Sequence, residues 1–183
     1  MTNIFKSIKP VLLAAVTVVI GSAGTAFAVD QVTRRSDRVT FRGEITAMSI
    51  ESITIGLSNG QTQVIPVSDI LSVRFDMEPS LLAQAQSNER SGALDVALEK
   101  FKSVQKEYNG NDKRVIADIE FLIARTMVKQ ALADPEKVPA AIAAIRKFRE
   151  ENKSNFRYFE ALLLESSLAT GPDAQALLKE VQM

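Results

Sequence analysis

The polar and apolar positions of this chain change their period once. Over 38–76, apolar side chains such as Ile53, Ile55 and Leu57 alternate with small or polar ones, which is typical of strands with one apolar face. Over 77–183 they recur every three or four positions, the period of amphipathic helices. The sequence therefore predicts an α+β protein, with a small β domain followed by an all-α domain.

The β domain should contain four or five short strands in about 40 residues, too few for a sandwich. Strands are predicted over 39–48, 53–57 and 70–75. Between the last two, Asn59-Gly60 favours a type I′ hairpin turn, because both residues tolerate positive φ. Such a turn would pair Leu57 with Thr62 and so fix the register of the hairpin.

These strands are expected to form a small, strongly bent antiparallel barrel. The run Arg42–Phe75 resembles SH3-like and Sm-like barrel modules, especially in its Gly43-x-Ile45 opening and in the Ile65-Pro66 pair before the closing strand. Sm-like barrels often bind RNA, but this run has no basic stripe with interleaved aromatic residues. We therefore expect no nucleic-acid partner.

The all-α domain should contain six helices in three antiparallel pairs. Two helices are predicted within 80–109, joined by a tight turn at Ser91-Gly92, and four more over 113–133, 139–151, 155–169 and 172–181. Glycine and proline residues separate them, since proline pushes the residue before it out of the helical region. One pair alone cannot bury its apolar face, whereas three stacked pairs can.

The first helix pair resembles a tetratricopeptide repeat (TPR). Gly92, Ala97 and Phe101 match the inter-helix glycine, the packing alanine and the aromatic of that family, and Ala85 matches the small residue of its first helix. Leu81 replaces the bulky aromatic that is usual early in the repeat. The resemblance implies a TPR-like solenoid.

A second small–aromatic pair supports the same resemblance. Ala144 and Phe148 stand four residues apart, as do the alanine and phenylalanine of the first repeat. Asn109-Gly110 departs from the family, because proline is usual at the end of the repeat. The resemblance therefore implies about three helix pairs of irregular spacing.

In TPR proteins, the first helix of each pair lines a concave groove that holds a peptide or partner segment. If Leu81 is the fourth position of the repeat, the candidate partner-binding residues are Leu82, Gln86, Glu89 and Arg90. The alternative is that these four residues form ordinary solvated helix surface. No pattern of Lys and Asn suggests a clamp for a C-terminal carboxylate.

The N-terminus has the pattern of a secretory signal peptide over 1–28. Lys6 and Lys9 precede the apolar run 11–20, and Ala-Phe-Ala at 26–28 provides a cleavage site with small residues. The alternative is an uncleaved membrane anchor, which needs about 20 apolar residues. Cleavage predicts a mature chain without stable membrane insertion, located in the periplasm or cell envelope.

The mature chain should begin with a flexible leader over 29–37, because this stretch has no sustained period and carries Arg34 and Arg35. Loss of Lys6 and Lys9 with the signal peptide reduces the basic residues from 22 to 20 against 22 acidic ones. A slightly acidic chain of this kind is not typical of a nucleic-acid binder.

Composition excludes much catalytic chemistry. Cysteine, histidine and tryptophan are absent, so the chain has no thiol nucleophile, no histidine base and no Cys/His zinc site. No phosphate loop, nucleophile elbow or dinucleotide fingerprint occurs. We expect no enzyme, no cofactor and no metal. The sequence favours an exported scaffold or adaptor that binds a protein or peptide. The alternatives are an accessory subunit or regulator of an envelope enzyme complex, and a membrane-anchored structural protein.

Overall fold

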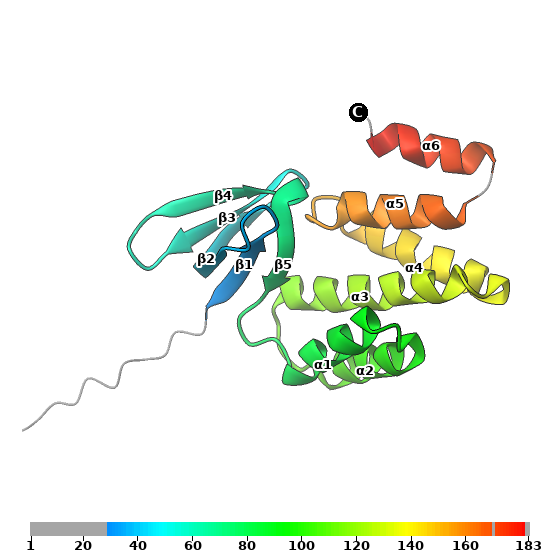
Figure 1. Ribbon diagram of the computed structural model, residues 1–183, viewed down its shortest axis with the longest axis horizontal. Coiled ribbons are helices and arrows are strands. Elements are labelled where there is room, and N and C mark those ends of the chain that lie inside the picture. The colour runs from blue at the N-terminus through cyan, green and yellow to red at the C-terminus, as the bar shows by residue number, and fades with distance from the viewer. Residues whose placement is uncertain (1–28, 170, 182–183) are drawn as a thin grey trace, which may run out of the picture.

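The computed structural model describes residues 29–169 and 171–181, and it confirms the α+β class. A five-stranded antiparallel sheet comes first, and six helices follow, packed in sequential pairs (Figure 1). The predicted signal peptide, 1–28, lies outside the described residues. No helix in the described ranges combines the length and the apolar character needed to cross a membrane.

The sheet is open, with strand order β4-β3-β2-β1-β5. Its strands are β1 (Asp30–Arg34), β2 (Thr40–Met48), β3 (Ser52–Leu57), β4 (Thr62–Pro66) and β5 (Ile70–Arg74). Strands β4 and β5 are therefore the two edges, and the expected barrel is not confirmed. A short 3-10 turn, Val67–Asp69, leads from one edge strand to the other.

The predicted leader is wrong for most of its length, because residues 30–34 form strand β1 in the interior of the sheet. Val32 is fully buried and lies opposite Phe41 of β2 and Val73 of β5. With one inward apolar residue, the stretch is too short to display a period of two. Pairing on both sides supplies the stabilisation that its own sequence lacks.

The β3–β4 hairpin has a different turn from the predicted one. Leu57 N–H donates to the Gln61 carbonyl (2.8 Å), which leaves a three-residue loop that ends in Gly60 at φ +81°. This geometry is a type I turn followed by a left-handed glycine. Because the pairing shifts by one residue, Ile53 faces Ile65 and both are buried, whereas Val64 is 62% exposed.

All six predicted helices are present, and α3 is the longest. They are α1 (Ser80–Arg90), α2 (Leu94–Glu107), α3 (Lys113–Ala131), α4 (Val138–Glu151), α5 (Tyr158–Leu168) and α6 (Pro172–Val181). Gly92 adopts φ +83° in the α1–α2 turn, as expected for a glycine at a helix end. Asp112 caps α3 by accepting from Arg114 N–H (2.8 Å). Helix α3 contacts α1, α2, α4 and α5, so it forms the centre of the helical part.

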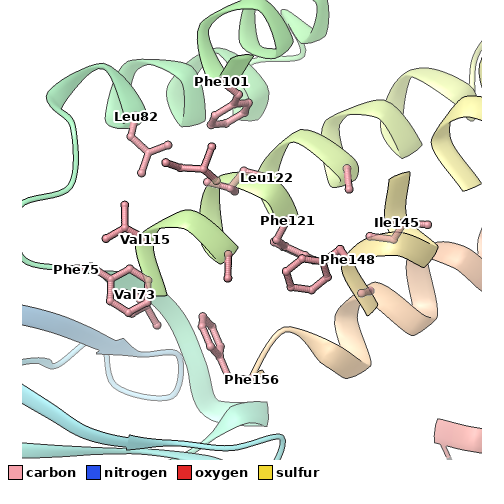
Figure 2. Close-up of a cluster of buried hydrophobic side chains, with 14 of the residues drawn as sticks. Val73, Phe75, Leu82, Phe101, Val115, Phe121, Leu122, Ile145, Phe148 and Phe156 are labelled. Atoms are coloured by element: carbon pink, nitrogen blue, oxygen red, sulfur yellow. The ribbon is translucent and has the colours of Figure 1, made fainter. Parts of the chain in front are cut away.

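The buried core runs without interruption from the sheet into the helices (Figure 2). Strand β5 contributes Val73, the residue directly after it is Phe75, and α3 contributes Val115 and Phe121. Phe148 of α4 packs against Phe121 with ring centroids 5.2 Å apart. This shared core holds the edge strand β5 beside α3, and that juxtaposition creates the candidate site.

Candidate binding cleft

A cleft of about 420 Å³ lies between edge strand β5 and the helices, and we call it the β5 cleft. In Figure 1, β5 is the strand of the sheet that lies nearest to the helices. The cleft is lined by Leu71, Ser72, Val73 and Arg74 of β5, Ala83, Gln86, Glu89 and Arg90 of α1, Leu122, Arg125 and Lys129 of α3, and Arg157 before α5. Five basic side chains and one acidic side chain therefore surround it.

The hydrogen bonds of β1 reveal which backbone groups of β5 are free. Arg34 N–H donates to the Val39 carbonyl (2.9 Å), on the β2 side of β1. Arg35 N–H donates to the Asp69 carbonyl (2.6 Å), on the β5 side. Successive residues of a strand direct their backbone groups to opposite sides. Even-numbered residues of β1 therefore bond toward β2, and odd-numbered residues bond toward β5.

It follows that Val73 presents its backbone N–H and C=O to the outer edge of the sheet. Gln31 and Thr33 pair with Arg74 and Ser72, so the backbone groups of those two β5 residues face β1. Val73 stands between them and faces the opposite way. Val73 as a whole is only 3% exposed, its side chain belongs to the core, and the residue lines the β5 cleft, so its backbone donor and acceptor lie at the wall of that cleft.

Glu89 forms the centre of an ion-pair network at the floor of the cleft. Arg125 donates two hydrogen bonds to Glu89, from Nε to Oε1 (2.8 Å) and from Nη2 to Oε2 (2.5 Å). Lys129 Nζ lies 3.0 Å from Oε1. Burial opposes ionisation of Glu89, but the hydrogen bonds from Arg125 and Lys129 more than offset it, and the pKa of Glu89 lies below its ordinary value.

The network continues through Arg125 and Arg157 into the helical core. Arg125 Nη1 lies 3.4 Å from Glu160, and Arg157 Nη1 donates to the same carboxylate at 3.1 Å. Arg157 also donates to Asp118 Oδ1 through Nε (3.2 Å) and Nη2 (3.1 Å). Both guanidinium groups approach the ring of Phe121, with 5.4 and 4.8 Å from Cζ to the ring centroid.

The rim of the cleft exposes cations, whereas most of their counter-charges are buried. The Arg74 and Lys129 side chains are 54% and 39% exposed, but their partners Glu78 and Glu89 are only 6% and 1% exposed. Arg90 is exposed and forms no ion pair with any residue that the structure describes. The face that a ligand would meet is therefore predominantly positive.

The structure brings three of the four candidate residues together. Gln86, Glu89 and Arg90 all line the β5 cleft. Leu82 does not line it, since its side chain is 1% exposed and belongs to the hydrophobic core. Leu82, Ala85 and Glu89 share the inward face of α1, at the three- and four-residue steps that place side chains on one side of a helix.

Sequence reasoning missed the opposite walls of the cleft. Arg125 and Lys129 lie one turn apart on α3, among residues that are otherwise largely apolar. Charged side chains on the buried face of a helix are unusual and could have indicated a partner carboxylate. The contribution of β5 has no comparable sequence signal, because it depends on how the sheet packs against the helices.

A second hollow, of about 650 Å³, lies beside the middle of β2 and the end of β3 and includes Asp30 and Arg114. Asp30 and Arg114 bond to each other and link the sheet to α3, so we assign them a structural role. Among residues 29–169 and 171–181, no group of three or more acidic side chains is arranged to hold a metal ion. The β5 cleft is the better candidate because it combines free backbone groups with exposed charge.

Comparison with known proteins adds no family assignment: no known family, no curated protein and no solved structure matches this chain significantly.

Proposed function

We propose that this chain is an exported, non-catalytic adaptor, and that its β5 cleft holds a segment of a partner protein in the periplasm or cell envelope. The observation that carries the proposal is the convergence of Gln86, Glu89 and Arg90 with an edge strand around one open cleft. A cleft of this size accommodates a short stretch of chain, and its walls come from four separate parts of the chain.

The ion-pair network supports a binding role rather than a catalytic one. Arg125 and Arg157 are each held by two carboxylates, and Glu89 is held by two cations. Groups fixed in this way form a rigid surface that is already organised before a ligand arrives. No side chain that lines the cleft is a histidine, a cysteine or an activated hydroxyl.

We also propose that the helices form a TPR-like array. Ala97 and Phe101 are fully buried, as expected for the packing pair of a repeat, and Gly92 has the positive φ that a tight inter-helix turn requires. Each helix packs against the next along the chain. In this arrangement, the SH3-like or Sm-like module acts as one wall of the cleft and contributes its edge strand.

Site-specific photo-cross-linking in cells tests the proposal. A photoreactive residue replaces Gln86 in the cleft in one strain, and it replaces Glu99, which is exposed on α2, in the other. We expect adducts of higher mass from position 86 alone, recovered in the periplasmic fraction. Equal adducts at the two positions would place the partner elsewhere, and no adduct at position 86 would overturn the proposed site.

A further inference from the structure

We propose that the partner segment binds as an additional β-strand along the free edge of β5, and that this segment is acidic. The inference rests on the proposed function, since it specifies what occupies the same cleft. Peptides add to exposed sheet edges through main-chain hydrogen bonds, and pockets for alternate side chains provide specificity. The β5 cleft offers an edge strand and a lining of charged side chains.

The first argument is the unpaired backbone of β5. Val73 directs its N–H and C=O toward the cleft, and no strand within residues 29–169 and 171–181 lies on that side of β5. The N–H of Phe75, the next group on that side, is not available to an added strand, because it already donates to Glu78 Oε2 (3.3 Å). The available edge therefore consists of the central part of β5, beside α1 and α3.

The second argument is charge. Arg90 on α1 and Lys129 on α3 face the same cleft as the β5 edge, and Arg74 stands at the end of the strand. A strand that lies in the cleft directs every second side chain toward the helices. Acidic side chains at those positions would pair with the exposed cations, whereas basic ones would be repelled.

Two other occupants fit the cleft less well. The N-terminal segment of this chain, 1–28, carries Lys6 and Lys9 and no acidic residue, so its charge is the same as that of the rim. A second copy that paired through β5 would bring its own Arg74 toward the same cationic surface. Like charges opposed across a strand pair are destabilising. An acidic segment of another protein would pair with the free backbone groups of β5 and with the exposed cations of the rim.

The test uses purified chain 29–183 and synthetic peptides of about nine residues, which overhang the five-residue strand β5. The probe has Glu at every second position with Val and Thr between, and a matched peptide has Lys in place of each Glu. Calorimetry measures the affinity of each. We expect binding of the Glu peptide, and affinity for the Lys peptide lower by at least on the order of tenfold.

Backbone methylation then distinguishes strand addition from side-chain docking. Two further Glu peptides carry N-methyl groups, one on the Glu residues and the other on the residues between them. In an added strand, only one of these sets directs its N–H groups toward β5. We expect one methylated peptide to lose binding and the other to keep it. Equal behaviour of the two would overturn strand addition.

A charge-reversal variant locates the bound peptide. Arg90→Glu should weaken binding of the Glu peptide by at least on the order of tenfold, because it reverses an exposed charge of the cleft. Lys102→Glu makes the same change in net charge on the exposed surface of α2 and should have little effect. Equal effects of the two variants, or none, would overturn the inference, including its choice of β5 over the other edge, β4.

The remaining outcomes separate this inference from the proposed function. If the Glu peptide does not bind, the inference is overturned. It is also overturned if sedimentation analysis shows that the chain is a dimer and that the peptide does not dissociate it. Adducts from position 86 in cells would still support an adaptor whose cleft holds a segment of different chemistry. Failure of the cross-linking experiment overturns the proposed function whatever the peptides do.

Discussion

Arg114, in the first turn of α3, donates a hydrogen bond to Asp30 at the start of β1, with 2.7 Å between Nη1 and Oδ2. The Asp30 carboxylate is almost completely buried, and it also accepts from Ile45 N–H (3.0 Å) and Asp76 N–H (2.8 Å). One side chain therefore joins two strands, the connection to the helices and α3 itself. This link helps to hold the sheet at the distance from α3 that creates the β5 cleft.

Asp30→Ala should be strongly destabilising, because it leaves the N–H groups of Ile45 and Asp76 without their acceptor and removes one of the two carboxylates that pair with Arg114. Loss of one partner of a buried pair costs about 3–5 kcal/mol. Arg114 is one-third exposed, so we expect about 2–4 kcal/mol after allowance for its partial exposure. Urea denaturation of the variant and of the wild type measures the difference.

Asp37→Ala is the matched control for that experiment. Asp37 also pairs with an arginine, Arg34, but the pair lies at the surface. Exposed pairs contribute little, so this variant should unfold close to the wild type. If Asp30→Ala behaved like the control, Asp30 would not link the sheet to the helices.

Phe101→Ala should create a cavity at the α1–α2 contact. The ring is fully buried, and truncation of a buried phenylalanine costs about 3–5 kcal/mol. Ala97→Leu should overpack the same contact at about 1–3 kcal/mol. Lys102→Ala, at the exposed position next to Phe101, serves as the control in thermal melts. A melting temperature of Phe101→Ala equal to that of the control would contradict the TPR-like packing.

The pH dependence of stability should reveal the ionised state of Glu89. Its pKa is lower in the folded chain than its ordinary value of 4.5, since Arg125 and Lys129 offset the effect of burial. The stabilisation is therefore complete above the ordinary pKa, and it is lost as the pH falls through the folded pKa. Glu89→Gln should be less stable than the wild type at pH 7, and the difference should shrink below about pH 4.5.

Glu78 provides a control of opposite sign. Burial raises the pKa of Glu78 above its ordinary value despite the hydrogen bond from Arg74. The folded chain therefore holds this proton more tightly, and ionisation of Glu78 lowers stability as the pH rises. Glu78→Gln should remove that loss. Urea titrations between about pH 3.5 and pH 7 should give pH slopes that change in opposite directions for the two variants. Slopes that change in the same direction would refute the assignment.

The sequence predicted the helices better than the strands, for a physical reason. Helix ends have local signals, such as Gly92 with its positive φ and Asp112 as a cap, and these need no information from elsewhere in the chain. Strand β1 has one inward apolar residue, Val32, and depends on its neighbours β2 and β5. Asn59-Gly60 predicted the hairpin correctly. Its loop has three residues and not two, which shifts the register by one residue, and the Asn-Gly signal does not distinguish these two loop lengths.

The candidate site was predictable only where a helix face sufficed. The TPR pattern named Gln86 and Arg90 as partner-binding residues, and both line the β5 cleft, whose role in binding stays a prediction. It could not reveal that Glu89 is buried, because burial of that carboxylate depends on Arg125, which is 36 residues away. The same TPR pattern assigned Leu82 to the groove, but its apolar side chain lies in the core.

Stability measurements should separate the surface of the β5 cleft from the network beneath it. Gln86→Ala and Arg90→Ala remove side chains without partners in the core, and such surface changes stay within about 0.5 kcal/mol. Arg125→Ala should cost about 2–4 kcal/mol, because it leaves Glu89 buried with Lys129 as its one remaining cation. Thermal melts rank the three variants.

The proposed function requires that Arg90→Ala, while as stable as the wild type, cross-links its partner through position 86 less efficiently. Full cross-linking by Arg90→Ala would move the binding surface away from α1, whereas a large loss of stability would mean that Arg90 belongs to the buried network.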